Sequence, residues 1–440
     1  MTRLVSLALA ACVALCLAAD AQGQPGPVGA ADKAQVIDAL TKALEQQYVF
    51  PEVAAKMAEL IRKNLAAGRY EAVDDPRAFA DALTEDLRSV SKDRHLRVRY
   101  APERIREERA QDEAAKRAAE EARNRMERFS NYAFREVKIL PGNLGYLKFD
   151  GFRASQGAFA VAVGAMAFLA NCDALIVDLR DNGGGSSEMI QLLSSYFFDG
   201  DPKHLNSFYY RKDEKVEQTW TLPYVPGRRM PDTPIFVLTS SYTFSGAEEF
   251  TYNLKNMKRA TIVGETTGGG AHPVRMEILT DDFVANVPFA RAVNPISRAN
   301  WEGTGIDPDV KVAADLALPT AQTLALETLV GREQDARVKA IYQWTLEAQR
   351  ARAQPPAIDE MVLRSYAGIY GPRTITFEGG ALHYQRANGR KMKMLPMAED
   401  TFQFDEAPAF RLKFLTKDGQ VVAVEGRYDD GTIDTTPRTK

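Results

Sequence analysis

The sequence predicts an α/β protein whose core is preceded by a helical bundle and followed by a small antiparallel β domain. Three observations predict this class. Apolar residues recur at three- and four-residue steps from Asp32 to about Arg99, which is the period of amphipathic helices. Strand-like runs alternate with helix-prone stretches between about residues 132 and 312. From Ala357 onward, short strands are separated by turn signals. A chain of 440 residues is also long enough for two or three domains.

The first residues have the pattern of a secretory signal peptide. A short basic start, MTR, precedes an apolar stretch over residues 4–19, and the sequence ADA at 19–21 has the small-x-small form of a cleavage site. This predicts a signal peptide over residues 1–21, cleaved after Ala21, and a periplasmic or extracellular protein. The apolar stretch is shorter than a membrane-spanning helix, so we expect no stable membrane insertion after cleavage. Lipoprotein anchoring at Cys12 is the alternative, but the residues after Cys12 are apolar where a lipid-anchored tether should be polar.

Composition excludes several classes of protein. The chain has 56 Lys and Arg against 59 Asp and Glu, so its net charge of −3 offers no basic surface for nucleic acid. Once the signal peptide is removed, Cys172 is the one cysteine left and no intramolecular disulfide can form. Four histidines and one mature cysteine, without CxxC, HExxH or other zinc-ligand spacing, predict neither a metal site nor a cofactor.

The N-terminal region is expected to be helical throughout. Pro51 and the Gly68/Pro76 region break the periodic pattern of residues 32–100 into about three helices, which would form a small bundle. Residues 101–131 differ abruptly, with acidic and basic residues in equal number around a ladder of alanines. A partner-binding coiled coil needs a sustained apolar seam, which this segment lacks. We therefore expect a charged, solvated connecting helix.

The core is predicted to occupy residues 132–315. Its expected strands are 144–149, 175–179, 235–239 and 261–264, and its expected helices are 155–169, 186–198 and 245–255. Residues 316–354 return to helix and form a helical linker, which ends before Pro355-Pro356. The β domain then covers residues 357–440, with turn signals at Gly379-Gly380 and Asn388-Gly389 among others.

The first segment that could carry chemistry is IVDLRDNGGG, Ile176 to Gly185. It reads as a strand that runs into three consecutive glycines just before a helix near Ser186. Backbone N–H groups in such a turn point outward and bind negative charge, either a phosphate or a reaction oxyanion. Neither a Walker motif nor GxGxxG is present. A plain tight turn is the alternative interpretation.

The second segment is LTSSYTFSGAEEF, Leu238 to Phe250, in which Ser245-Gly246 opens a helix after a strand and a polar turn. A serine at a strand-to-helix turn exposes its hydroxyl, and the following N–H groups face the same space. One turn can thus supply a nucleophile and half of an oxyanion hole. The alternative is that Ser245 is only the helix N-cap, with Glu248 completing a capping box.

The order of four motifs carries a resemblance. DLRDNGGG, TSSYTFSGAEEF, IVGETTGGGAHP and WEGTGIDPDV, in this order, resemble the C-terminal-processing (tail-specific) serine peptidase superfamily. The nearest branch is similar to the repeats of interphotoreceptor retinoid-binding protein (IRBP) and their bacterial relatives, without a PDZ domain. Glu136–Phe152 resembles the start of that branch's core and Ser91–Tyr100 the end of its helical N-terminal domain, so the resemblance spans about residues 33–315.

The resemblance implies a crotonase-like spiral core with Ser245 as the nucleophile. It implies an oxyanion hole made by the N–H of Gly246 and that of Gly183 or Gly184. Processing peptidases use a lysine as the general base, but the matching position here is Gly270, so a Ser/Lys dyad is not expected.

Tricorn-type relatives use a Ser/His/Glu arrangement instead. The resemblance places His95 as the base and Glu302 as its acidic partner, with His272 as the alternative base. Arg94 stands where those relatives commonly have glycine, and it would either depress the basicity of His95 or bind a substrate carboxylate.

The function that follows is a secreted serine peptidase, a hydrolase that cleaves peptides or unfolded proteins through an acyl-enzyme without a cofactor. The alternative function is a non-catalytic protein that binds a peptide or an apolar ligand on the same fold, as the retinoid-binding branch does.

Overall fold

The computed structural model describes residues 26–109 and 113–439. The predicted signal peptide, with Cys12, lies outside these residues. The chain divides into two compact units. Unit 1 combines the chain up to Met126 with Asn206–Gln218 and Gly269–Gly303, and unit 2 comprises Glu127–Leu205, Thr219–Gly268 and the chain from Thr304 onward. No helix in the described ranges has both the length and the apolar character needed to cross a bilayer.

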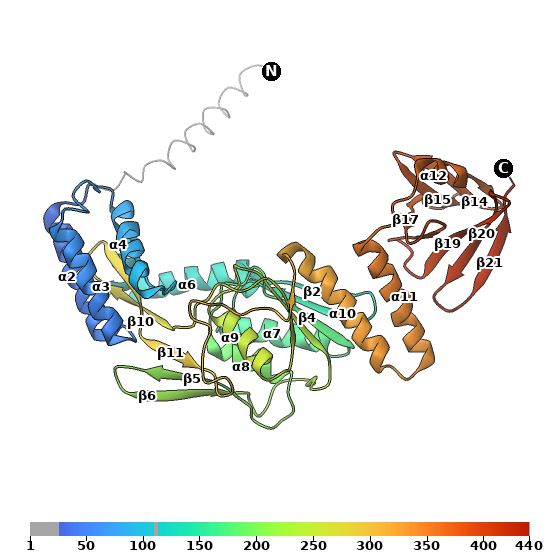
Figure 1. Cartoon of the computed structure of the whole chain (residues 1–440). Coiled ribbons are helices and arrows are strands. Elements are labelled where there is room, and N and C mark those ends of the chain that lie inside the picture. The colour runs from blue at the N-terminus through green and yellow to red at the C-terminus, as the bar shows by residue number, and fades with distance from the viewer. Residues whose placement is uncertain (1–25, 110–112, 440) are drawn as a thin grey trace, which may run out of the picture. The chain divides into compact units, whose positions relative to one another are not determined.

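Unit 1 is built on three helices, as the hydrophobic period predicted: α2 (Ala30–Gln47), α3 (Pro51–Ala66) and α4 (Pro76–Ser91). They lie side by side in Figure 1. Proline occupies the first turn of α3 and of α4, where a missing N–H breaks no helical hydrogen bond. Asp75 caps α4 by accepting from the N–H of Ala78 at 2.8 Å. The apolar faces of these helices form one core with strands of a small sheet.

This small antiparallel sheet has the order β1-β10-β9. Its strands are β1 (Arg97–Tyr100), β9 (Val274–Ile278) and β10 (Phe283–Pro288). Because β1 and β9 both run antiparallel to β10, they begin at the same end of the sheet. The residues just before each strand therefore meet: 93–96 ahead of β1 and 271–273 ahead of β9.

Two further elements belong wholly or largely to unit 1. A second three-stranded sheet joins β11 (Ala290–Val293), β5 (His204–Tyr210) and β6 (Lys215–Trp220). The charged segment forms α5 (Pro102–Arg109) and α6 (Glu113–Phe129), and α6 has no buried residue. α6 is thus solvated, as the composition indicated, whereas α5 buries Ile105.

Unit 2 contains a six-stranded sheet of order β12-β8-β7-β4-β3-β2. The strands are β2 (Phe134–Leu140), β3 (Leu144–Phe149), β4 (Ala174–Asp178), β7 (Ile235–Thr239), β8 (Thr261–Gly264) and β12 (Val310–Lys311). All neighbouring pairs are parallel except β2 with β3. The carboxyl ends of β4, β7 and β8 therefore lie at one edge, where parallel sheets place their ligand-binding loops.

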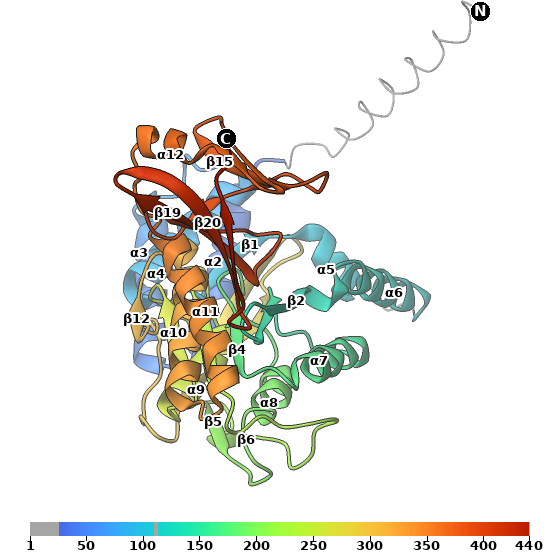
Figure 2. The same ribbon diagram turned by 90° about the vertical axis from the view of Figure 1, so that its right-hand side faces the viewer.

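Helices cover both faces of this sheet, which explains why β4 and β7 are completely buried. Side chains such as Leu175 and Val177 pack against α7 (Gln156–Leu169), α8 (Ser187–Ser195) and α9 (Gly246–Asn256). Ile176, which points the other way, packs with α10 (Ala317–Arg332) and α11 (Ala336–Ala353). These last two helices, expected as a linker, lie against each other in Figure 2 and contribute to the core.

The C-terminal part of unit 2 is α12 (Glu360–Tyr366) with two antiparallel sheets. One sheet contains β13 (Gly368–Tyr370), β14 (Arg373–Glu378), β15 (Ala381–Arg386) and β16 (Met392–Lys393). The other contains β17 (Leu395–Pro396), β18 (Thr401–Gln403), β19 (Phe410–Lys417), β20 (Gln420–Tyr428) and β21 (Ile433–Pro437). The predicted class, a helical N-terminal region, a mixed α/β core and small antiparallel sheets, is confirmed.

Candidate functional site

Ser245 stands at the turn between β7 and α9 in a strained conformation. Its φ of 55° and ψ of −120° lie outside the regions that a side chain ordinarily permits. The residue is half-buried. Glu248 does accept from the N–H of Ser245, at 2.8 Å. Ser245 is thus the N-cap of α9, with Glu248 in the capping-box position that the sequence predicted.

Glu248 braces the serine turn from inside the protein. Its side chain is completely buried, and besides the N–H of Ser245 it accepts from the hydroxyl of Thr267 at 2.5 Å. Thr267 in turn accepts from the N–H of Ile306 at 2.8 Å. The carboxylate therefore ties the start of α9 to the loop after β8, near the helix N-terminus that favours a negative charge.

The glycine turn packs directly against the serine turn. A Cβ on Gly184, whose φ is +100°, would lie 2.6 Å from the nitrogen of Gly246 and 2.8 Å from the Cβ of Ser245. A Cβ on Gly246 would lie 2.7 Å from the carbonyl oxygen of Gly185. Neither position can therefore hold a side chain, because the backbone of the glycine turn and that of the serine turn are in direct contact.

The N–H groups of these turns differ in what they donate to. Gly183 donates to the carbonyl of Asp150 at 3.3 Å, and Gly184 donates to the side-chain oxygen of Asn182 at 2.9 Å. Within residues 26–109 and 113–439, the N–H groups of Gly185 and Gly246 have no acceptor. These two donors, from adjoining turns beside Ser245, are free to bind an anionic oxygen.

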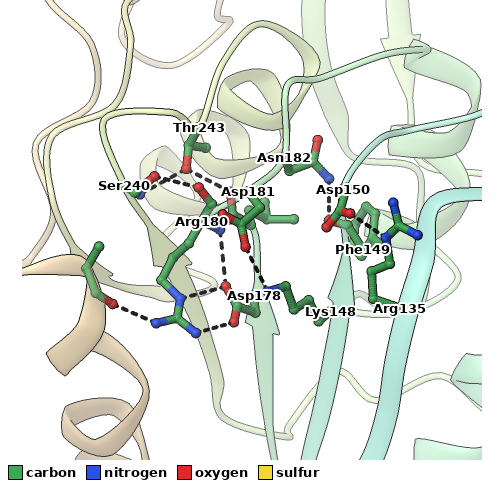
Figure 3. A network of polar contacts seen from close by, with 12 residues as sticks. Arg135, Lys148, Phe149, Asp150, Asp178, Arg180, Asp181, Asn182, Ser240 and Thr243 are labelled. Atoms are coloured by element: carbon green, nitrogen blue, oxygen red, sulfur yellow. Dashed lines mark hydrogen bonds and ion pairs between the residues drawn. The ribbon is translucent and has the colours of Figure 1, made fainter. Parts of the chain in front are cut away.

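A buried ion pair supports the glycine turn from below (Figure 3). Asp178, at the end of β4, is completely buried and receives two hydrogen bonds from the guanidinium of Arg180, at 2.9 and 2.6 Å. The backbone N–H of Arg180 donates to the same carboxylate at 3.1 Å, and the hydroxyl of Tyr146 does so at 2.7 Å. Burial by itself would raise the pKa of Asp178, but the hydrogen bonds from Arg180 and Tyr146 outweigh it and hold that pKa below its usual value.

The same pair connects the loops that follow β4 and β7 (Figure 3). The hydroxyl of Ser240 donates to the carbonyl of Arg180 at 2.5 Å, and that of Thr243 donates to the carbonyl of Leu179 at 2.8 Å. The Arg180 guanidinium also donates to the carbonyl of Ala314 at 2.6 Å. The glycine turn and the serine turn are thus held in register by side chains on both loops.

A second cluster of titratable groups lies in unit 1. Nδ1 of His272 is 2.7 Å from Oδ2 of Asp93 and 3.3 Å from Oε2 of Glu302. The side chains of Asp93 and His272 are 1% and 3% exposed, and that of Glu302 is 16% exposed. Because both partners of Nδ1 are carboxylates, the neutral imidazole carries its proton on Nδ1 and a lone pair on Nε2.

Hydrogen bonds hold both carboxylates of this cluster in place. Asp93 accepts from the hydroxyl of Tyr48 at 3.3 Å and from the backbone N–H of His95 at 3.0 Å. Glu302 accepts from the backbone N–H of Ala271 at 2.6 Å. Burial, and then the charges of Asp93 and Glu302, raise the pKa of Tyr48, so its hydroxyl stays protonated and remains a donor.

His95 lies in a different environment from His272. Burial lowers the pKa of His95 to about 4, with further lowering by His272 and Arg88, while Asp93 opposes the shift. At neutral pH His95 is therefore uncharged and a weak proton acceptor. The ion pair that the structure describes for Glu302 is with His272.

The predicted site residues thus fall into two groups. Ser245, Gly246, Gly183 and Gly184 belong to unit 2, and His95, His272 and Glu302 belong to unit 1. Sequence reasoning missed Asp93, which lies in KDRH two residues before a histidine that was singled out. It also missed the free N–H of Gly185. Neither the spacing nor the residue type distinguishes these positions.

Comparison with known proteins identifies the family. A sequence model of peptidase family S41 matches residues 143–312, and a model of the N-terminal domain of peptidase S41 in eukaryotic IRBP matches residues 31–139. Together they cover well over half of the chain, which belongs to peptidase family S41. This confirms the resemblance seen in the motifs. The two matches nearly adjoin, which leaves no space between them for a PDZ domain.

Solved structures with a similar chain course include a candidate peptidase from Parabacteroides merdae, 20% identical, with a TM-score of 0.48 over 67% of this chain and 96% of that one. A lipoprotein from Streptococcus agalactiae is 16% identical, with a TM-score of 0.46 over 69% of this chain and 97% of that one. The photosystem II D1 C-terminal processing protease is 17% identical, with a TM-score of 0.42 over 64% of this chain and 93% of that one.

Replacing Gly184 by alanine should disrupt the site. The added Cβ meets backbone atoms that cannot move aside and sits at a φ of +100°, so we expect a loss of about 1–3 kcal/mol in the free energy of unfolding. Gly183→Ala is the matched control, because its Cβ meets nothing within 4 Å, and it should change stability by less than about 0.5 kcal/mol. Urea unfolding of both variants checks this; equal losses would contradict the packing described.

The Asp178–Arg180 pair should make stability depend on pH in acid. Because folding lowers the pKa of Asp178, its contribution is present at neutral pH and is lost as the pH falls below about 4. Asp178→Asn, which leaves the Arg180 charge unpaired, should cost about 3–5 kcal/mol at pH 7. It should also lose less stability than the wild type between pH 5 and 3.

Asp181→Asn is the control for this prediction, since Asp181 forms a more exposed pair with Lys148 and should cost less than about 1 kcal/mol. Urea unfolding across the pH range provides the measurement. Parallel pH profiles for wild type and Asp178→Asn would show that this carboxylate is not responsible.

Proposed function

We propose that this chain is a serine peptidase that hydrolyses peptides or unfolded proteins through an acyl-enzyme on Ser245. Membership of family S41 supports peptidase chemistry. The observation that carries the assignment to Ser245 is the turn itself: a serine in a strained backbone conformation, beside two N–H groups that have no acceptor within the described part of the chain.

In the first step, Oγ of Ser245 attacks the scissile carbonyl carbon and gives its proton to the general base. The oxyanion that forms is bound by the N–H groups of Gly246 and Gly185. We assign the second donor to Gly185, in place of the Gly183 or Gly184 that the resemblance implied, because those two N–H groups already donate within the protein. The base then protonates the leaving amine. In the second step the base takes a proton from a water molecule that attacks the acyl carbon, and it returns that proton to Oγ of Ser245 as the acid product leaves.

We assign the general base to His272, which the sequence offered as the alternative to His95. Its Nδ1 is held by a buried carboxylate, Asp93, and its Nε2 carries the lone pair that accepts a proton. Glu302, on the same nitrogen, stabilises the imidazolium that forms.

The place of action proposed is outside the cytoplasm. The support is the sequence pattern of residues 1–21, which includes a basic start, an apolar stretch and a small-x-small site. A substrate of unfolded protein or peptides would be met in the periplasm or the medium.

The serine assignment is tested by treating the folded protein with a fluorophosphonate, which bonds to an activated serine oxygen and loses fluoride. Intact mass should show one adduct per chain, and Ser245→Ala should show none while unfolding at the same urea concentration as wild type. Ser241→Ala is the control, since Ser241 is an exposed serine of the same loop and should not affect labelling. An unlabelled, folded wild type would instead support the non-catalytic binding function.

The base is tested by comparing His272→Gln with His95→Gln in the same labelling reaction. His272→Gln should slow labelling by at least about 100-fold, the usual contribution of a general base. His95→Gln should slow it by less than about tenfold. The reverse order would restore the Ser245/His95/Glu302 arrangement that the resemblance implied.

The export proposal predicts the mature N-terminus. Protein produced with its own first residues in a Gram-negative host should begin at Gln22, as read from the mass of its N-terminal peptide. A lipid-modified Cys12 at the N-terminus would establish membrane anchoring instead, and an uncleaved Met1 would contradict export.

A further inference from the structure

The cluster of Asp93, His272 and Glu302 also has the composition of a metal site. Each of the three residues offers one ligand atom, and these atoms all lie within 4.8 Å of one another. Imidazole nitrogen with two carboxylate oxygens is a common ligand set for zinc. No sequence motif predicted this ligand set, because the three residues come from distant parts of the chain.

The charge of the cluster favours a cation. Two carboxylates, one of them almost completely buried, form their described ion pairs with the same nitrogen of one histidine. Buried carboxylates are stable only when they are paired or bound to metal. A divalent cation would balance the two negative charges fully.

Two of the three ligand separations are close to those around a small, tetrahedrally bound ion. Zinc bonds of about 2.0–2.1 Å place neighbouring ligand atoms about 3.3 Å apart. Nδ1 of His272 is already 3.3 Å from Glu302, and its 2.7 Å separation from Asp93 would open by about half an ångström.

Outer hydrogen bonds hold the two carboxylates as they do in known metal sites. Tyr48 and the N–H of His95 donate to Asp93, and the N–H of Ala271 donates to Glu302. Glu302, the most exposed of the three side chains, marks the edge from which an ion would enter.

We propose that Asp93, His272 and Glu302 form a binding site for Zn²⁺, with water as the fourth ligand. Zn²⁺ fits better than Mg²⁺ or Ca²⁺, because these harder cations select oxygen ligands and a neutral imidazole does not serve them. The cluster thus has two states, one with the Nδ1 proton of His272 between the carboxylates and one with the metal in its place.

The two states differ in what His272 can do, and this consequence rests on the proposed function. Zn²⁺ binds the lone pair of Nδ1, so the single proton of the neutral imidazole moves to Nε2. With Nε2 protonated, His272 cannot accept the proton of Ser245. Zn²⁺ therefore acts as a reversible inhibitor of the peptidase, and removal of the ion restores the base.

Direct binding tests the site independently of activity. Metal-free mature protein, with any affinity tag removed, is titrated with Zn²⁺ in a calorimeter, and one ion per chain is expected. His272→Gln, Asp93→Asn and Glu302→Gln should each weaken binding at least about tenfold, the loss that even an outer-shell partner can cause. The controls are His204→Gln and His383→Gln, the histidines that lie outside both the cluster and His95, and they should bind as wild type does.

Co²⁺ provides a second measurement that needs no variant. Substituted for Zn²⁺ in the wild-type protein, it should give the visible absorption of a tetrahedral site with nitrogen and oxygen ligands. Absence of saturable Zn²⁺ binding, or binding of equal strength in His272→Gln, would overturn the site.

The inhibitory consequence is tested by fluorophosphonate labelling with and without Zn²⁺. Labelling of Ser245 should stop when one ion is bound and resume when a chelator removes it. Zn²⁺ bound at full occupancy without slower labelling would overturn the inhibition while the site stands. Failure of Ser245 to react in metal-free protein would overturn the proposed function, and the calorimetric result would be unaffected.

Discussion

The arrangement of the candidate site in unit 2 depends on the close contact between the glycine turn and the serine turn. Gly184 touches the nitrogen of Gly246 and the Cβ of Ser245 so closely that a single added carbon would collide with both. Two peptide chains approach in this way only where neither has a side chain to interpose. The approach places the N–H groups of Gly185 and Gly246, which have no acceptor among the residues that the structure describes, in adjoining turns beside one hydroxyl. This is the arrangement needed to bind a developing oxyanion.

Such a contact between loops needs support from a rigid scaffold. The loops leave neighbouring parallel strands at the same edge of the sheet, so their starting points are set by strand register. Beyond the strands, Asp178 and Arg180 hold the first loop, and Ser240 and Thr243 bind its carbonyl groups from the second. Glu248 holds the serine itself. Each of these polar side chains is buried or half-buried and hydrogen-bonded, so the strain at Ser245 is maintained by interactions that are costly to break.

The chemistry of unit 1 arises differently, from the ends of two strands in one small sheet. Because β1 and β9 begin at the same end, the segments before them bring Asp93 next to His272 across 179 residues of sequence. The carboxylates of Asp93 and Glu302 give the neutral imidazole a defined tautomer. A carboxylate that orients a base and one that binds a metal are chemically the same group, so the proposed base and the proposed zinc site would use the same nitrogen of His272.

Features encoded in short stretches could be derived from the sequence alone. The helices of the N-terminal bundle, the solvated α6, the strands of the core and the β domain follow from hydrophobic period and turn residues. The order of four motifs sufficed for the family, and Ser245 stood out because a strand, a polar turn and a helix start are all local signals. The signal peptide is equally local, and it stays a prediction.

Tertiary structure alone decided which groups meet and which are already in use. Gly183, Gly184 and Gly185 are the same residue type in sequence. Only the hydrogen bonds in the structure show that the N–H groups of Gly183 and Gly184 already donate within the protein. Asp93 and His272 meet because of the register of a sheet, which depends on packing between segments far apart in the chain. The hydrophobic period of a segment reports which face is buried, but the partner of a polar side chain is set by long-range strand pairing, and that information is not present in any short stretch of sequence.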